Sequence, residues 1–321
     1  MMDQLIATLS FGSMLALMAS GLALTYSVSR IANFAHGDYA TAGIIAYYIA
    51  ALLIHGKVTS DTLNPLESWP AIALSFIAGS AAALASLWLV FKPLRDRGST
   101  PLQLMVASIG VEIILRSILY IIYTLNFGSQ PIVPSNPKLA SIASVPMRFA
   151  DIVAPFAAVA SVIFVAVLTT KTLIGISMRA VASNPRLAEA SGININLVES
   201  LAWFIGGGLA GLGGVLWFLW QPPATHPAES GWQILAFVFA AVTLGGLRSF
   251  YWTLVASFLI AAAYYPATNI ILPALGLDPG LGYAIPLAVV IIVLLFLPDG
   301  LSSLTPKVMR LVEPIRARAV G

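Results

Sequence analysis

The chain has 321 residues, of which 59% are hydrophobic and only 9% are charged, and it contains no cysteine. An ordinary soluble domain carries about 25% charged residues, so this composition excludes a chain whose whole surface faces water. The lack of cysteine excludes disulfides, thiol nucleophiles and cysteine metal sites. The net charge of +3 is spread too thinly to indicate nucleic-acid binding.

Apolar stretches that could cross a bilayer follow one another along the whole chain. They are Leu5–Val28, Asp38–Ile54, Pro70–Phe91, Pro101–Leu125, Phe149–Thr170, Leu197–Trp220, Trp232–Leu247, Ser249–Thr268 and Leu281–Leu297. A crossing takes about 20 residues, so the shortest stretches are marginal spans or half-helices that meet inside the membrane. The sequence therefore predicts an all-α, polytopic transmembrane bundle of roughly eight to ten spans, forming one domain over residues 1–321. The first cation is Arg30, which favours a retained first span over a cleaved signal peptide.

The cations gather in three regions, which predict the orientation of the bundle. These regions are the loop after the third stretch (Lys92, Arg95, Arg97), a later loop (Lys171, Arg179, Arg186) and the tail (Lys307, Arg310, Arg316, Arg318). The positive-inside rule places them, and with them the C-terminus, in the cytoplasm. The side of the N-terminus depends on the number of spans and stays open.

The first break between spans, Arg30–Asp38, contains Asn33, Phe34, His36, Gly37 and Asp38. Ionisable residues at membrane depth usually face a cavity or a pathway, which favours a role in translocation. The alternative is an interfacial turn between two spans.

The second break, Leu244–Phe250, contains Gly245, Gly246 and Arg248 and has a similar layout, with an apolar segment on each side. Similar broken segments in two parts of a chain indicate a translocation site built from an internal repeat. Coincidence in apolar sequence is the alternative.

The loop at about 171–196 predicts a short helix with clear ends. Asn184 suits the N-cap, Pro185 the first helical position and Gly192 the residue after the helix. A helix of about seven residues is unstable alone in water, so we expect it to dock. It packs either on this chain's own helix ends or, with Ala188 at its centre and Arg179 before it, in the groove of a partner as a coupling helix.

Two further features lie within spans. Small residues four apart in Gly206–Gly214 predict close helix packing. Glu112 and Arg116 are spaced to pair on one helix face, and a role in the pathway stays open. Catalytic sets, metal-ligand spacings and phosphate-binding loops are not recognisable, which predicts no enzyme activity, cofactor or metal. Uphill transport would then need a partner or an ion gradient.

Four segments resemble the permeases of branched-chain amino acid ABC importers. Asn33–Asp38, read Asn-Phe-Ala-His-Gly-Asp, resembles the hallmark of one permease subunit type of that family. Gly175–Asn194 resembles the loop that contacts the ATPase, Val242–Ser249 the late Leu-Gly-Gly signature and Leu297–Leu301 the Pro-x-Gly-Leu ending. The late signature departs from the family, because Arg248 and bulky residues follow where small residues are usual.

The resemblance implies a bacterial or archaeal cytoplasmic-membrane protein that works with a second homologous permease, two ATP-binding cassette subunits and an extracytoplasmic solute-binding protein. The substrate would be a branched-chain amino acid, with urea, short amides and aromatic acids as alternatives. A different class of function, an ion-coupled secondary transporter or channel, would use Asp38, His36, Glu112 or Arg248 to bind or relay ions.

Overall fold

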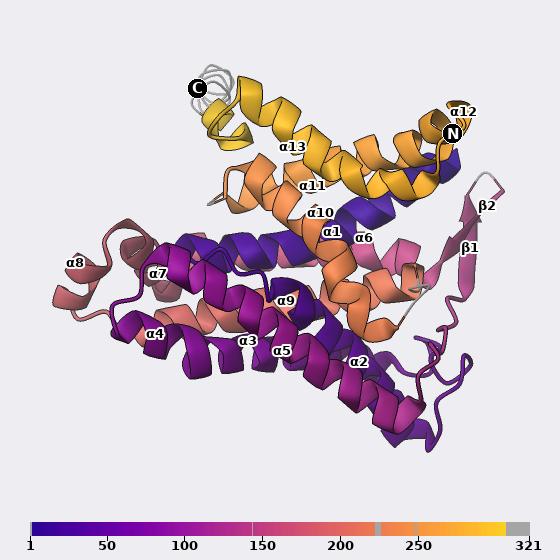
Figure 1. Ribbon diagram of the computed structural model, residues 1–321, viewed down its shortest axis with the longest axis horizontal. Coiled ribbons are helices and arrows are strands. Elements are labelled where there is room, and N and C mark those ends of the chain that lie inside the picture. The colour runs from indigo at the N-terminus through magenta and orange to yellow at the C-terminus, as the bar shows by residue number, and fades with distance from the viewer. Residues whose placement is uncertain (1, 143, 222–225, 248, 306–321) are drawn as a thin grey trace, which may run out of the picture.

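The computed structural model describes residues 2–142, 144–221, 226–247 and 249–305, and it is almost entirely helical (Figure 1). The α-helices are α1 (Met2–Ser29), α2 (His36–His55), α3 (Trp69–Ser86), α4 (Lys92–Asp96), α5 (Pro101–Phe127), α6 (Phe149–Lys171), α7 (Leu173–Ser183), α8 (Pro185–Ala190), α9 (Ile195–Trp220), α10 (Ser230–Gly245), α11 (Phe250–Pro266), α12 (Leu272–Ala274) and α13 (Ile285–Phe296). Strands β1 (Lys138–Ile142) and β2 (Val145–Arg148) form an antiparallel hairpin. Short π-helical turns, η1 (Leu87–Phe91) and η3 (Ala267–Ile271), continue α3 and α11, and 3-10 turns are found at Pro227–Glu229, Pro279–Ala284 and Leu301–Leu304.

Eight helices of the described chain are long and apolar enough to cross a membrane. They are Met2–Ser29, His36–His55, Trp69–Asp96, Pro101–Phe127, Phe149–Lys171, Ile195–Trp220, Pro227–Gly245 and Phe250–Ala274. A shorter apolar segment, Gly280–Phe296, follows them. The predicted polytopic bundle of eight to ten spans is therefore confirmed.

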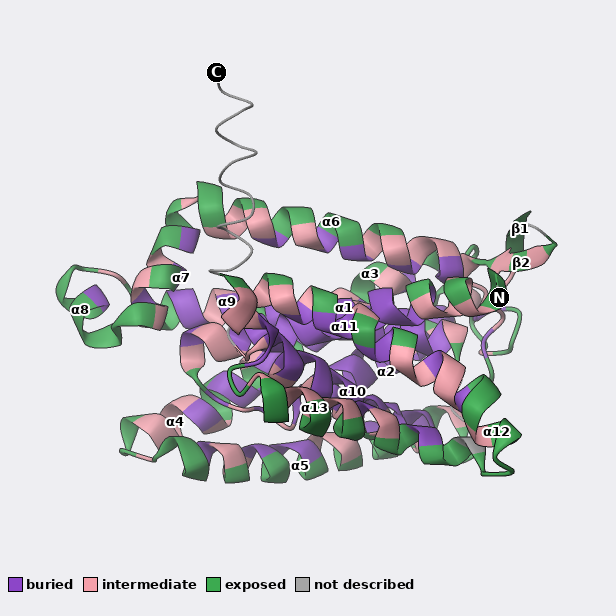
Figure 2. Ribbon diagram, turned by 90° about the horizontal axis from the view of Figure 1, so that it is seen from above, coloured by how far each residue is buried: buried purple, intermediate pink, exposed green. Residues whose placement is uncertain are grey.

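The bundle has buried helices at its centre and exposed apolar helices on two outer sides. Helices α1, α2 and α9 lie in the centre, whereas α5 and α6 lie on opposite outer sides (Figure 2). The most apolar window of α9 is 83% buried, against 22% for those of α5 and α6. Helices α7 and α8 project from one end of the bundle, which we call the loop end, and β1–β2 project from the other, the hairpin end (Figures 1 and 2).

Glycines of α9 let three helices approach its backbone, as the small-residue spacing predicts. Gly206 touches Gly21 of α1, and a methyl group on either glycine would collide with the other's carbonyl oxygen. Gly207 and Gly211 face α3, where Gly79 approaches them in the same way. Close backbone contact at these glycines therefore adds to the packing of the large buried side chains, such as Trp203 and Met18, at the centre of the bundle.

The helices form an inverted repeat in which α1, α2, α3 and α5 correspond to α9, α10, α11 and α13. Helix α3 packs on α9 as α11 packs on α1, and α5 packs on α2 as α13 packs on α10. Helices α3 and α11 both end in a π-helical turn, at η1 and η3. Gly37 and Gly231, each the second residue of its helix, touch each other where α2 and α10 begin. Both helices therefore start at one point and run to opposite ends.

This arrangement corrects the predicted pairing of the two breaks. The counterpart of the break before α2 is the segment that leads into α10, of which the structure describes the 3-10 turn Pro227–Glu229, and not Leu244–Phe250. Gly246 packs instead against Asp299 and Ser302 at the loop end, where it forms an ordinary turn between α10 and α11. The layout of Leu244–Phe250 resembled the first break only because a Gly-bearing polar turn between apolar helices looks the same in sequence wherever it lies in the membrane.

Candidate functional site

The chain between α1 and α2 returns from the loop end into the bundle. The backbone amide of Phe34 donates to the Ser108 hydroxyl of α5 at 3.0 Å, and His36 Nε2 is 2.9 Å from the carbonyl oxygen of Met18 in α1. Met18 lies eleven residues before the end of α1, about 16 Å along the helix. Helix α2 therefore begins inside the bundle and not at its surface.

Polar side chains satisfy the backbone of this break, which is required where water is absent. The Asn33 side chain accepts from the Ala35 amide at 3.1 Å and donates to the Tyr39 hydroxyl at 2.9 Å. Both Asn33 and His36 are 1% exposed. Asn33 and His36 therefore stabilise the interruption between α1 and α2 within the bundle.

Asp38 belongs to a small group of charges formed by α2 and α5. It is 1% exposed, and neither of its carboxylate oxygens has a hydrogen bond of ordinary geometry to a described residue. The groups that interact with it are the Thr41 hydroxyl and the Arg116 guanidinium. Arg116 in turn forms an ion pair with Glu112, one turn earlier on α5. The positive N-terminal end of α2 also favours the Asp38 carboxylate.

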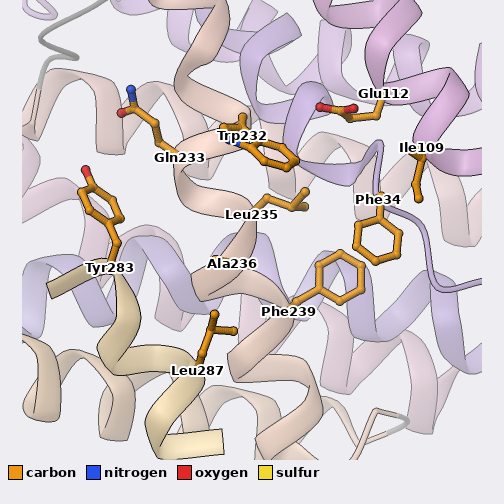
Figure 3. A pocket seen from close by; sticks show the side chains of 10 residues that line it. All are labelled: Phe34, Ile109, Glu112, Trp232, Gln233, Leu235, Ala236, Phe239, Tyr283 and Leu287. Carbon is orange, nitrogen blue, oxygen red and sulfur yellow. The ribbon is translucent and has the colours of Figure 1, made fainter. Parts of the chain in front are cut away.

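A cavity of about 690 Å³ lies beside this group (Figure 3). The break between α1 and α2, together with α5, α10 and the start of α13, forms its walls, and the residues are Phe34, Ile109, Glu112, Trp232, Gln233, Leu235, Ala236, Phe239, Tyr283 and Leu287. The rings of Phe34 and Phe239 stack with centroids 4.6 Å apart. The Arg116 guanidinium lies over Trp232, 5.0 Å from the ring centroid. The cavity is thus mostly apolar and aromatic, with the carboxyl group of Glu112 in one wall and Arg116 next to it.

A second cavity, of about 520 Å³, lies at the loop end. Gly246 and Arg179 are among its lining residues, and Gly245 is buried nearby against Thr253. Arg248 lies outside the described residues. Gly245 and Gly246 are therefore far along α10 from the break that holds Asn33 and Asp38.

The loop at 171–196 folds as the sequence predicts. Helix α8 spans Pro185–Ala190, the Asn184 side chain caps it by accepting from the Leu187 amide at 3.1 Å, and Gly192 follows with φ of +83°. The Arg179 guanidinium donates to the carbonyl oxygen of Thr169 in α6 and thereby ties α7 to the bundle.

The two faces of α8 differ. Ala188 is 3% exposed and packs on this chain's own core, whereas Leu187 is 64% exposed. Ala188 is the buried residue of α8, whereas the other residues of the helix, Leu187 among them, are exposed and open to a partner.

Comparison with known proteins gives a match along nearly the whole chain. Residues 4–294 match the family described as the branched-chain amino acid transport system permease component. The chain belongs to this permease family. It is 30% identical over 307 residues to the probable branched-chain amino acid transport permease protein LivH of Methanocaldococcus jannaschii, which covers 94% of this chain and 92% of that protein.

Two bacterial relatives agree. The high-affinity branched-chain amino acid transport system permease protein LivH of Salmonella typhimurium is 27% identical over 315 residues, covering 94% of each chain. The corresponding permease BraD of Pseudomonas aeruginosa is 28% identical over 309 residues, covering 94% of this chain and 95% of BraD. No solved structure gives a significant match. The protein is thus a multi-pass membrane permease, a transport component and not an enzyme.

Of the predicted pathway residues that the structure describes, only Phe34 lines the larger cavity. Asn33 and His36 hold the break, Gly37 allows α10 to approach, and Asp38 acts through Arg116. The sequence prediction left the role of the Glu112–Arg116 pair open, although charges in mid-span were a usable signal. Trp232, Phe239 and Tyr283 were missed, because an aromatic residue in an apolar helix carries no such signal. Among the described residues, no three His, Asp or Glu side chains could share a metal ion.

Proposed function

We propose that this chain is one of two homologous permeases in an ATP-driven importer of the bacterial or archaeal cytoplasmic membrane. Its partners are the second permease, two ATP-binding cassette subunits and an extracytoplasmic solute-binding protein. The substrates are branched-chain amino acids or closely related amino acids. Membership of the permease family and the projecting α7–α8 unit support this assignment.

The main support for the proposal is the α7–α8 unit. Its inner side packs on the bundle, and its outer side exposes apolar residues. Met178 and Ala188 are buried, whereas Leu173 and Leu187 are 82% and 64% exposed. Large apolar side chains exposed at an end of a bundle, where the protein meets water, usually mark a contact with a partner protein. In the proposed complex an ATPase groove receives this face, and movements of the ATPase reach α6 and α9 through the tied loop.

The orientation follows from the same unit. The loop end carries Arg95, Lys171 and Arg179, so the positive-inside rule makes it cytoplasmic. The chain then ends in the cytoplasm, and β1–β2 face the solute-binding protein on the outer side.

The second permease closes the larger cavity. The cavity opens on the side of α5, α10 and α13, and Ile109, Trp232 and Leu287 on its rim are 41%, 57% and 50% exposed. A homologous subunit against this side would complete a path between the two chains.

Reconstitution tests this proposal. The chain is co-expressed with candidate ATPases and second permease, and the complex is placed in liposomes with the binding protein outside. Uptake of labelled leucine should require ATP inside and stop with ADP. Uptake by this chain alone, driven by a proton or sodium gradient, would overturn the assignment and favour the secondary-transporter alternative.

Leu187→Asp tests the coupling face directly. A carboxylate there should prevent association with the ATPases, while the permease still inserts in the membrane. Leu139→Asp introduces the same change at an exposed residue of the hairpin end and should leave ATPase association intact. Normal association of the Leu187→Asp variant would remove the α8 face from the proposal.

A further inference from the structure

The charged group in mid-bundle is unusual for its place in the described spans. Glu112 and Arg116 are the only charged residues among the 27 of α5, and α10, which faces them, has none. Asp38 stands in the first turn of α2, which itself begins inside the bundle. Other charged residues of the described long spans lie within a few residues of a helix end. Burying charged side chains at this depth is energetically costly, and residues of this kind usually serve a function.

The Glu112–Arg116 pair is placed for contact with a ligand. Glu112 lines the cavity although its side chain is only 4% exposed. Arg116 lies over the ring of Trp232, another lining residue, and its Nε atom has no hydrogen-bond partner among the described residues. A pair that served only to neutralise itself could face lipid or protein anywhere along α5; in this pair Glu112 lines the cavity, and Arg116 contacts two of the lining residues, Glu112 and Trp232.

The rest of the cavity is suited to an apolar group. The Phe34–Phe239 stack forms one part of the wall, and Leu287 and Tyr283 of the C-terminal part of the chain form another. A ligand that fills this space therefore meets the Glu112 carboxylate at one side and mostly apolar and aromatic carbon elsewhere (Figure 3), with the Arg116 guanidinium next to Glu112 and Trp232.

We propose that Glu112 and Arg116 bind the ammonium and carboxylate groups of an α-amino acid whose apolar side chain lies against the aromatic wall. This inference rests on the proposed importer and assigns the residues that recognise its substrate. Binding would exchange one ion pair within the protein for two between protein and ligand, so no charge is left unpaired. The negative charge of Asp38 attracts Arg116 and helps to keep the guanidinium in place while Glu112 turns to the ligand.

This assignment separates the substrate classes that the sequence left open. Urea and short amides have no charges to offer the pair. An aromatic acid without an amino group would occupy Arg116 but leave Glu112 buried without a cation, which is costly. Only a zwitterion satisfies both groups at once.

Saturation-transfer NMR on the assembled complex in nanodiscs, without binding protein, tests the site, because it detects weak ligands. The probes are leucine, its deaminated analogue 4-methylpentanoate, its decarboxylated analogue isoamylamine, and urea. Leucine should bind at least about tenfold more tightly than each of the other three, as expected when a charged hydrogen bond is lost. Equal binding of urea and leucine would overturn the proposal.

Two variants assign the groups individually. Glu112→Gln should remove the preference for leucine over 4-methylpentanoate, and Arg116→Gln should remove the preference for leucine over isoamylamine. A merely structural role would weaken all four probes together. The Lys92→Gln/Asp96→Asn variant removes another i,i+4 ion pair, on α4 and away from the cavity, and should bind as the wild type does.

The ATPase activity of each complex shows whether it has assembled, and leucine uptake by the wild type tests the importer separately. Failure of uptake would count against the proposed function. Wild-type preferences in both Gln variants, in a complex that imports leucine, would refute the charged-pair site alone.

Discussion

Replacing Gly37 with alanine tests whether α2 and α10 begin at a shared backbone contact. A methyl group on Gly37 would collide with the carbonyl oxygen of Gly231, and one on Gly231 would lie 2.5 Å from the Thr41 hydroxyl oxygen. The Thr41 hydroxyl also accepts from the Gly231 amide at 2.9 Å, so the two helices cannot separate without losing a buried hydrogen bond.

The magnitude follows from two opposing contributions. Overpacking costs about 1–3 kcal/mol, and the cost should be near the upper value because backbone and not a flexible side chain blocks the space. Removing a glycine from a helix returns at most about 1 kcal/mol. We therefore expect a loss of about 2 kcal/mol for Gly37→Ala, and a similar loss for Gly231→Ala.

Thermal unfolding of the purified permease in nanodiscs, at one fixed heating rate, measures the effect. A loss of 2 kcal/mol should lower the midpoint by about 3 °C in a chain of this size. Gly110→Ala is the matched control, because nothing lies within 4 Å of the position where its methyl group would stand. If Gly37→Ala is as stable as Gly110→Ala, the contact between the two helix starts does not exist.

Three further changes probe other parts of the molecule. Ala188→Asp places a carboxylate in the core contact of α8 and should destabilise α7–α8 by about 2 kcal/mol or more, measured as faster proteolysis of that loop. Arg95 and Glu199 form a bidentate pair at 2.5 and 2.6 Å between α4 and α9; either Gln variant alone should cost about 1–3 kcal/mol in thermal unfolding, and a double variant measurably less than the sum. Burial lowers the pKa of His226, so its neutral form favours the fold and stability should fall as the pH drops below about 6.5; His226→Gln should flatten that dependence.

The elements that sequence could locate are those whose signals are local. Hydropathy found the long helices, because each must present about 20 apolar residues to lipid. The capping signals of Asn184, Pro185 and Gly192 delimited α8, because a helix end needs particular groups at particular positions whatever surrounds it. The glycine spacing of α9 also indicated close helix packing, because small residues four apart lie on one face of a helix and let another backbone approach.

The features that sequence could not locate depend on helices that meet only in the folded chain. Gly231 has no local mark of a mid-membrane contact, and its role appears only when α10 lies beside α2. Trp232 and Tyr283 reach the cavity from segments more than a hundred residues beyond Glu112. Single aromatic residues in apolar helices are common, so their type and spacing do not distinguish cavity from core.

The polarity of the hallmark segment Asn33–Asp38 suggests that it contacts the substrate directly. The structure instead indicates that it stabilises the break between α1 and α2 and so positions other residues at the cavity. Its hydrogen-bonding groups are largely used within the protein, by the Ala35 amide, the Tyr39 hydroxyl and the Met18 carbonyl oxygen. Such partners make an interrupted helix tolerable in the membrane interior. The interruption brings Phe34 to the cavity and Asp38 to Arg116, where the proposed ligand contacts lie. If this is correct, Asn33→Ala should lower thermal stability without changing the preference of the complex for leucine over 4-methylpentanoate, whereas Glu112→Gln should change that preference.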